Sequence, residues 1–584
     1  MERTYWMATD KPFPGQRSGS DNSTKKRKIF HWKNAVIYHL LIDRFCDGNK
    51  ETNHSYRRGI DTLGRIIHPS GAIGSFHGGD LIGLTQKVRE GYFCSLGVDA
   101  LWVSAPFEQV HGWVVGGNEQ DGYFHHYGYH GYWIQDWTSI DSNVGTREQW
   151  SEFVAEAHAR GLRVIVDIVM NHPGYGTMLD ILHFEFGKLK PGWRKFMDSK
   201  TTRGLYPDVL NEWIDSSEQT QDAWSKFWGT DWIRANLPGY APPGNDEYTM
   251  NVDGLPDFYT ECDVEVELPP LLIKKWGAVR TTQEQRSCDD FFAKRAMKPT
   301  VRNYLIKWLT DWIRLDGIDG FRVDTARNVE LPAWKLLKEE SIAALREWKA
   351  ANPKAVLDDT EFWMVAEAYG HGLVRDEYFA NGFDAKINFS FSNRLKDHWK
   401  IEDIYAEQAR LINGKDAYQV LSYVSSHDDG LFDRVRLYDG AAMLIFAPGA
   451  VQIEYGDEIG RKVITGPAPE CYRSMMPWNE LDESLRNHWG ILIAFRRRHQ
   501  SVGAGSHQMV LREPYVFVRR FEQDVVMVGF GMRGHVLLPV RGVFHEGALI
   551  REAYSDHYAF VTRGSVRFDV SERGVVLLEE VQLV

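Results

Sequence analysis

The segment "GFRVDTARN" combines a short apolar run with charged side chains. If it forms a strand, residues two apart project to the same side, so Arg322 and Asp324 lie together. Two further acids, Glu367 in "VAEAYG" and Asp428 in "SSHD", also follow apolar runs. Buried charges are costly unless they are paired, so three carboxyl groups at strand ends, with His427 beside one, are better explained by catalysis than by stability. The residue types predict nucleophilic and acid–base chemistry.

Alternating helices and buried strands must position these side chains. The segment 146–161 predicts a helix, with a capping box from Thr146 and Gln149, and a continuous apolar strand follows it. The same unit recurs before "GFRVDT", where Trp308 and Trp312 fall on the buried stripe of the helix. Eight such strands predict a (β/α)8 barrel with its active site at the carboxyl ends of the strands. The predicted strand runs are "AVIYHLLIDRF", "ALWVSAPF", "RVIVDIVMNH", "GFRVDT", "FWMVAEAYG", "AKINFSF", "VLSYVSSHD" and "AVQIEYGDE".

Three parts of the chain interrupt or extend this alternation. A polar N-terminal arm precedes the barrel, some 90 residues rich in Trp, Asp, Gly and Pro predict an inserted subdomain after strand 3, and short Gly-separated β runs predict an antiparallel C-terminal domain. The predicted limits are 1–32 for the arm, 33–172 and 266–502 for the two parts of the barrel, 173–265 for the inserted subdomain and 503–584 for the β domain.

Composition narrows the function classes. The 584 residues are 43% hydrophobic and 25% charged, with a formal net charge of -12, which gives no basic surface for nucleic acid or an anionic membrane. The 5 cysteines are odd in number and scattered, so free thiols are expected rather than a disulfide framework or a zinc clip. No apolar leader segment appears, which predicts the cytoplasm; a chain whose signal had been trimmed would read the same and would predict the periplasm.

Four segments, in order, carry a resemblance to a known family. "DIVMNH", "GFRVDTARN", "VAEAYG" and "SSHD" resemble the conserved regions of glycoside hydrolase family 13, the α-amylase family, and "YHGYWIQDW", "GGDLIGL", "GLPDF" and "EYGDEIG" are similar to its flanking motifs. The resemblance extends from about residue 33 to the C-terminus. Within the family, "SAPFEQVHGWVVGG" and "LSYVSSHD" are most similar to the periplasmic-type α-amylases of Gram-negative bacteria.

The resemblance and the physical reading assign the same roles. A retaining glycosidase needs a nucleophilic carboxylate and an acid/base carboxyl about 5 to 5.5 Å apart. Asp324 is expected to be the nucleophile and Glu367 the general acid and base, while Asp428 stays ionised and binds sugar hydroxyls. Arg322 would keep Asp324 charged and aimed.

Further residues are implied to bind the substrate. By motif position, His172 and His427 would donate hydrogen bonds to one glucose and the ring of Tyr132 would stack beneath it, while Asp167 would support Arg322. Arg327 and Asn328 stand where most α-amylases have Lys and His on the leaving-group side, which leaves the exact substrate open. Trp113 and Trp133 are candidate sugar platforms in loops at the mouth.

Calcium is the expected cofactor, because hard oxygen ligands of the kind that calcium prefers occur at two places. The resemblance implies one site between barrel and inserted subdomain and a second in an N-terminal loop; an Asn/Gly turn with a solvated Asp is the alternative at each. The first would use Asn171, Asp257 and the carbonyl near Asn328, and the second Asp47, Asn49, Asn53, Gly78 and Asp80.

The expected function is endo-acting hydrolysis of α-1,4-glucans such as starch and maltodextrins, since "GLPDF" has Leu255 where the 1,6-specific relatives tend to have Gln. A cyclodextrin- or maltooligosaccharide-processing or transglycosylating enzyme is the alternative. A non-catalytic sugar-binding barrel is disfavoured because all three acids are present. A metal-dependent phosphotransferase is disfavoured because no phosphate-binding loop pattern is found. The sequence does not predict an oligomeric state.

Overall fold

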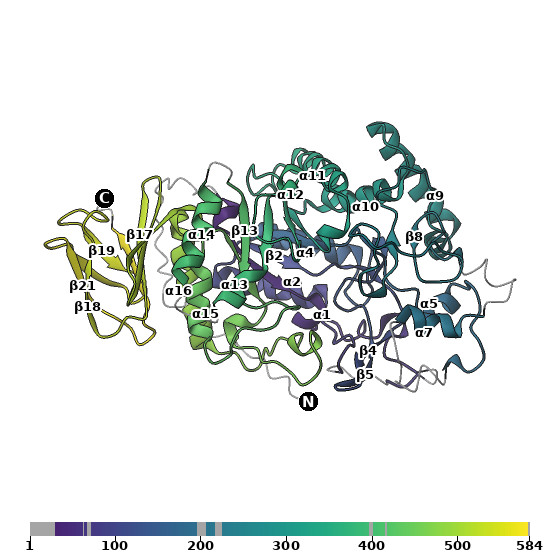
Figure 1. Cartoon of the computed structure of the whole chain (residues 1–584), viewed down its shortest axis with the longest axis horizontal. Coiled ribbons are helices and arrows are strands. Elements are labelled where there is room, and N and C mark those ends of the chain that lie inside the picture. Colours follow the sequence, from purple (N-terminus) through teal and green to yellow (C-terminus); the bar gives the residue numbers. More distant parts are fainter. Residues whose placement is uncertain are drawn as a thin grey trace, which may run out of the picture.

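The structure is a computed structural model, which describes residues 30–61, 64–66, 72–194, 206–215, 225–395, 401–414 and 417–581. The described chain is elongated, with a central barrel, a C-terminal β domain at one end and the elements inserted after the third barrel strand at the other (Figure 1).

Eight parallel strands close into the barrel. Their order around the barrel is β1-β14-β13-β12-β11-β10-β7-β2. Barrel strands that follow one another along the chain are therefore neighbours in the sheet, and β1 closes the barrel by pairing with β14. This confirms the predicted (β/α)8 barrel. The strands are β1 (Val36–Leu40), β2 (Ala100–Val103), β7 (Arg163–Ile168), β10 (Gly320–Val323), β11 (Trp363–Ala366), β12 (Ala385–Asn388), β13 (Gln419–Tyr423) and β14 (Ala450–Glu454).

Each strand is shorter than the apolar run from which it was predicted and ends before that run does. β10 ends at Val323, and Asp324 therefore follows the last strand residue; likewise β11 ends at Ala366, directly before Glu367. β13 ends at Tyr423, five positions before Asp428. The acids thus lie on the loops at the carboxyl end of the barrel, where parallel strands converge.

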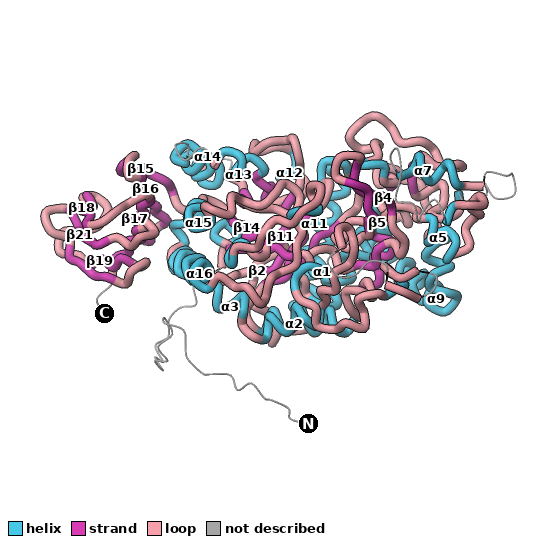
Figure 2. Tube along the Cα trace, turned by 90° about the horizontal axis from the view of Figure 1, so that it is seen from below, coloured by secondary structure: helices cyan, strands magenta, loops and turns pink. Residues whose placement is uncertain are grey.

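Helices cover the outside of the barrel (Figure 2). The capping box predicted for α4 is present, since the Thr146 side chain accepts from Gln149 N and the Gln149 side chain accepts from Thr146 N. α10 begins after Thr300 and ends at Gly317 in the left-handed conformation (φ 76°). Trp308 and Trp312 are buried, as predicted. The barrel helices are α2 (Leu81–Arg89), α3 (Tyr92–Leu96), α4 (Arg147–Ala159), α10 (Val301–Asp316), α11 (Leu331–Ala351), α12 (Glu377–Ala380), α13 (Phe389–Arg394), α14 (Ile401–Asn413), α15 (Leu437–Ile445) and α16 (Glu483–Arg498).

The amino end of the barrel is closed by aromatic side chains. Trp32, in a 3-10 turn (Trp32–Asn34), stacks on Trp363 with ring centroids 4.6 Å apart, and the Arg163 guanidinium lies over the Phe30 ring. Phe30 and Trp32, which the sequence placed in the arm, therefore pack against the base of the barrel, whereas His31 is exposed. The rest of the predicted arm, residues 1–29, lies outside the described residues.

Long excursions leave the carboxyl end after the second and third barrel strands. The first carries the pairs β3 (Phe107–Gln109) with β6 (Ile134–Ile140) and β4 (Val114–Asn118) with β5 (Gly122–His126). The second carries α5 (Met178–His183), α7 (Tyr206–Trp213), the pair β8 (Ile233–Arg234) with β9 (Asp257–Phe258), and α9 (Pro270–Arg295). The limits 173–265 for the inserted subdomain stay a prediction.

The C-terminal residues form an antiparallel β domain, as predicted. A six-stranded sheet has the order β15-β16-β17-β22-β19-β20, and β18 pairs with β21. The sheet has its own apolar core, while Phe517, Val528 and Leu577 belong to the core shared with the barrel. The strands are β15 (Ser506–Leu511), β16 (Tyr515–Phe521), β17 (Asp524–Phe530), β18 (His535–Pro539), β19 (Leu549–Glu552), β20 (His557–Phe560), β21 (Ser565–Asp569) and β22 (Val576–Glu580).

Candidate active site

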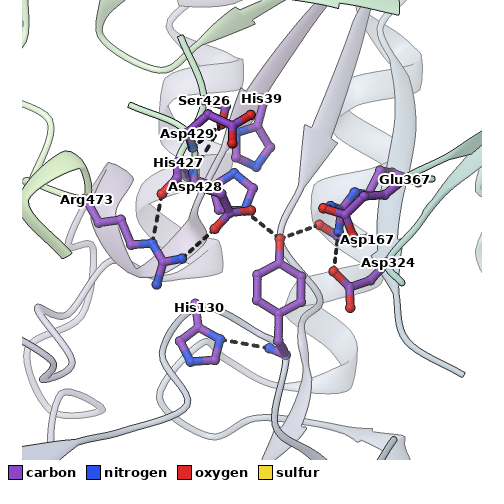
Figure 3. A network of polar contacts seen from close by, with 12 residues as sticks. His39, His130, Asp167, Asp324, Glu367, Ser426, His427, Asp428, Asp429 and Arg473 are labelled. Atoms are coloured by element: carbon purple, nitrogen blue, oxygen red, sulfur yellow. Dashed lines mark hydrogen bonds and ion pairs between the residues drawn. The ribbon is translucent and has the colours of Figure 1, made fainter. Parts of the chain in front are cut away.

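One arginine holds three carboxylates at the carboxyl end of β7, β10 and β11. Arg322 Nη1 lies 2.9 Å from Asp167 Oδ1 and 2.8 Å from Asp324 Oδ1, and its Nη2 lies 2.7 Å from Glu367 Oε1. The β10–β7 register sets Arg322 opposite Asp167. Figure 3 shows Asp167, Asp324 and Glu367 gathered on one side of the site. The sequence predicted the pairing of Arg322 with Asp324; the structure adds Glu367 to the same guanidinium.

Burial and crowding set the protonation of the two acids on this side. Burial raises the pKa of Asp324 to about 6, although the nearby Arg322 acts in the opposite direction. Burial also raises the pKa of Glu367, to about 8, and the neighbouring Asp324 and Asp428 carboxylates add to the shift. At neutral pH this arrangement favours an ionised Asp324 beside a protonated Glu367, which are the states that a nucleophile and a general acid require.

Asp428 lies across the site and has different partners. Its Oδ2 is 2.9 Å from His427 Nε2, and its Oδ1 accepts a 2.7 Å hydrogen bond from Arg473 Nη2. Burial alone would raise the pKa of Asp428, but His427 and Arg473 outweigh it and hold the pKa well below the ordinary value. The carboxylate is therefore ionised at neutral pH, as expected for a group that binds sugar hydroxyls.

Tyr132 joins the two sides. Its hydroxyl donates to Asp167 Oδ2 at 2.9 Å and lies 2.7 Å from His427 Nε2. Its ring lies parallel to the His427 ring, 13° between planes. His172 is buried behind this residue, with Nε2 3.2 Å from the Tyr132 carbonyl, and burial lowers the pKa of His172 to about 4. The structure thus brings Tyr132, His172 and His427 together.

The structure does not bring all of the predicted sugar contacts into the mouth. Arg327 donates from Nη1 to the Tyr369 carbonyl at 3.0 Å. Asn328 is buried, and its amide donates to the Glu247 carbonyl at 2.9 Å, so this amide is used by the protein itself. Trp113 is 5% exposed and its ring stacks on His125 at 3.4 Å; Trp133 is 7% exposed. Both tryptophans are packed in the fold and offer no open ring face, because loop side chains cover them.

Two features of the site were missed by the sequence analysis. Arg473 comes from "ECYRSMM", a segment without a recognisable pattern, and only the fold brings it to Asp428. A cleft of 310 Å³ is lined by Tyr369, Phe389 and Asp429 among others; Phe389 and Asp429 also line the small pocket that contains Glu367 and Asp428. Tyr369 is 61% exposed and packs edge-on against Phe389 at 5.3 Å. Its position two residues after Glu367 was a signal that could have identified it.

The predicted N-terminal calcium loop fits a cation in part. Asn53 donates to Asp47 Oδ2 at 3.1 Å, and a Cβ at Gly78 would lie 2.4 Å from the Asn53 amide, so these residues are in close contact. Within the described residues, Asp47 Oδ1 and Asn53 Oδ1 are buried without a hydrogen-bond partner. Asp80 differs from the expectation, because its Oδ1 accepts from Gly83 N at the start of α2 and its Oδ2 accepts from Asn49 N in the loop.

The other predicted calcium site fits less well. Asn171 Oδ1 is buried and lacks a hydrogen-bond partner in the described part of the chain. Asp257, however, forms a 2.6 Å ion pair with Arg234, so a guanidinium already supplies the positive charge beside this carboxylate. Burial raises the pKa of Asp257 to about 8 despite Arg234. An Asp that is already paired with Arg is a poor calcium ligand.

Comparison with known proteins agrees with this geometry. The family model "Alpha amylase, catalytic domain" matches residues 39–203 and 288–484. The chain is 42% identical over 531 residues to the periplasmic alpha-amylase of Escherichia coli (strain K12), which covers 88% of this chain and 74% of that protein. It is 24% identical to a cyclomaltodextrin glucanotransferase of Geobacillus stearothermophilus, covering 91% of this chain and 63% of the relative. The alpha-amylase of Geobacillus thermoleovorans, solved as a complex with acarbose, shares the fold with a TM-score of 0.60 and 18% identity, covering 95% of this chain and all of that one.

Proposed function

The chain belongs to the α-amylase family, glycoside hydrolase family 13, and from this premise we propose that it cleaves internal α-1,4-glucosidic bonds of starch and maltodextrins with retention of configuration. As a member of this family it is a glycosidase with cyclodextrin-acting relatives. The substrate, the bond position and the residue roles are the proposed part.

The shared arginine carries the proposal. Asp324 and Glu367 bind the two terminal nitrogens of one guanidinium, at 2.8 and 2.7 Å, and therefore cannot lie far apart. Retaining enzymes need their carboxyl groups about 5 to 5.5 Å apart, whereas inverting enzymes need roughly 6.5 to 9.5 Å to admit a water molecule. This arrangement favours direct attack by Asp324 on the anomeric carbon and a covalent glycosyl-enzyme.

The proposed steps follow from the protonation states. Protonated Glu367 gives its proton to the leaving glycosidic oxygen while ionised Asp324 attacks from the opposite face. Glu367, now ionised, takes a proton from water, which displaces Asp324 from the sugar. Asp428 accepts hydrogen bonds from the hydroxyls of the distorted ring, and Arg473 holds its carboxylate in place. Arg322 neutralises Asp324 again when the ester breaks.

The first experiment tests the stereochemistry. Proton NMR spectra recorded in the first minutes of maltoheptaose hydrolysis should show the α-anomer of the product before mutarotation. A β-anomer as the first product would contradict retention and with it the role of Asp324.

A cyclodextrin-processing activity is the second candidate. It is favoured by Arg327 and Asn328 in the segment after the nucleophile and by the identity to cyclomaltodextrin glucanotransferases. Initial rates on soluble starch, β-cyclodextrin and maltotriose separate the two. We expect starch to be cleaved fastest into mixed oligosaccharides; a marked preference for cyclodextrin would assign the second activity instead.

Calcium binding is proposed for the N-terminal loop of Asp47, Asn53 and Gly78. Family members generally bind calcium, and the two unpartnered buried oxygens support such a site here within the described residues. Bound calcium would fix this loop against α2 and would take no part in the bond cleavage. Addition of a chelator should lower the melting temperature of the wild type, and Asp47→Asn should remove most of that response. An unchanged melting temperature would leave the loop as an ordinary turn.

The location of the protein in the cell is also part of the proposal. No helix among the described residues is long and apolar enough to cross a membrane. A relative that is 42% identical carries the periplasm in its name, which supports the periplasm as the alternative to the cytoplasm predicted above. Cell fractionation with an activity assay on maltodextrin distinguishes them.

A further inference from the structure

A second layer of polar residues lies inside the barrel, beneath His427. His39 on β1 and Glu454 on β14 are neighbours in the register of these strands, and His39 Nδ1 lies 2.7 Å from Glu454 Oε2. Both side chains are 0% exposed. The His39 ring packs against Trp102, with ring centroids 4.3 Å apart, and against His427, 4.7 Å away with 31° between the ring planes. Figure 3 shows His39 next to His427, on the side of the site that holds Asp428.

The hydrogen bonds determine which nitrogen of His427 carries a proton. The Tyr132 hydroxyl has one proton and donates it to Asp167, so His427 Nε2 must supply the proton shared with that hydroxyl and with Asp428. Within the described chain, His427 Nδ1 and His39 Nε2 have no hydrogen-bond partner. Among the described residues, the rings of His39 and Trp102 pack against the His427 ring.

We propose that His39 and Glu454 are positioning residues that support His427 from the barrel interior and fix the direction in which its Nε2–H donates. Glu454 anchors His39 through the 2.7 Å contact, and the flat face of His39 sets the plane of the His427 ring. His427 in turn aligns Asp428. This inference rests on the proposed function, because His39 and Glu454 would affect catalysis only through the sugar-binding Asp428.

Electrostatics supports the same arrangement. Burial would lower the pKa of His427, but the facing carboxylates of Asp428 and Glu454 outweigh it and raise that pKa, against the positive charge of Arg473. Burial lowers the pKa of His39, and the positive charge of His427 contributes in the same direction. Of the two rings, His427 is therefore the one that is protonated more readily. Two other groups lie on this side of His427. The Tyr132 hydroxyl contacts His427 Nε2, and Asp167 accepts a hydrogen bond from that hydroxyl.

The test compares Glu454→Gln with Glu454→Asp. Proteins labelled with ¹³C at histidine Cε1 are titrated by NMR, and the His427 signal is assigned by its loss in His427→Asn. We expect Glu454→Gln to lower the pKa of His427 by roughly one unit, since it removes a nearby negative charge. We also expect kcat on maltoheptaose to fall roughly 10-fold with little change in KM, because misplaced catalytic groups affect the transition state. Glu454→Asp keeps the negative charge, so the pKa of His427 should stay near its wild-type value.

A matched control is available in the same barrel. His158 and Asp319 form another buried histidine–carboxylate pair, at 2.9 Å, away from the active site. Asp319→Asn should leave both the pKa of His427 and the kinetics at wild-type values.

Three outcomes separate this inference from the function on which it rests. If the wild type hydrolyses maltoheptaose but Glu454→Gln changes neither the His427 titration nor kcat, the positioning pair is wrong and the function stands. If the His427 titration shifts but the wild type cleaves no α-glucan, the pairing stands and the proposed function is wrong. His39, His427 and Glu454 each place one ligand atom within 4.8 Å of the others; one equivalent of zinc in the wild type, lost in Glu454→Gln, would overturn the inference in favour of a metal centre.

Discussion

The two sides of the active site hold carboxylates in opposite ways. On the β10–β11 side, Asp324 and Glu367 share the single guanidinium of Arg322 with Asp167, and the pKa values of Asp324 and Glu367 are raised. On the other side, Asp428 pairs with His427 and with Arg473, which also binds Glu470, and the pKa of Asp428 is lowered.

The difference shows how one residue type serves several roles within one pocket. Three carboxylates on one cation leave a deficit of positive charge, so one of them retains a proton at neutral pH. Asp428, with two cationic partners, stays ionised. The partners around each buried acid thus decide whether its pKa is raised or lowered.

The largest expected effect comes from the crowded side. Asp324→Asn removes the nucleophile, and we expect kcat on maltoheptaose to fall by about 10⁴-fold or more. Asp319→Asn, at the other end of the same strand, is the matched control and should keep near-normal turnover. Residual activity within about 100-fold of the wild type would mean that another group attacks the sugar and would remove Asp324 from its proposed role.

A smaller loss is expected on the side of Asp428. Arg473→Met leaves Asp428 with His427 alone, and we expect kcat/KM to fall about 10²-fold because the carboxylate is no longer held in place. The pKa of Asp428 should rise, since a positive charge is lost, and a ¹³C NMR titration of the Asp428 carboxyl group measures this rise.

Arg473→Lys sharpens this test. It keeps the charge but lacks the planar fork that reaches Asp428 Oδ1, Glu470 Oε1 and the His427 carbonyl together. The pKa of Asp428 in this variant should stay near that of the wild type while the rate is intermediate. An unchanged pKa of Asp428 in Arg473→Met would show that Arg473 does not hold the Asp428 charge.

This comparison could be predicted only in part from the sequence. Short-range patterns located the strands, the capped helix α4 and all three acids, because period, capping and strand ends depend on neighbouring residues. The contact between Arg473 and Asp428 joins residues 45 positions apart in the chain, and no local pattern encodes such a contact. For the same reason the burial of Trp113 and Asn328 was missed: it depends on loops that fold over them.

The smallest expected effect is on stability, where substitutions on the two sides of the site should shift the melting temperature in opposite directions. The pKa of Glu367 is raised in the folded protein, so between pH about 4.3, its ordinary pKa, and pH about 8 the unfolded chain binds fewer protons at this residue than the folded protein does. The stability of the fold therefore falls as the pH rises through this range. Glu367→Gln should therefore raise the melting temperature at pH 7, by roughly 1 to 3 °C, and the gain should disappear as the pH falls below about 4.

Asp428 should behave in the opposite way. Its lowered pKa means that the ionised form stabilises the fold at any pH above the ordinary value near 3.9, and that this contribution is lost as the pH falls through the acid range. Asp428→Asn should lower the melting temperature at pH 7 by a similar amount, because Arg473 and His427 lose their carboxylate. Melting curves of both variants and the wild type at pH 4 and pH 7 measure the two signs. Shifts of the same sign at pH 7 would show that the two sides do not differ electrostatically, whatever their effects on the rate.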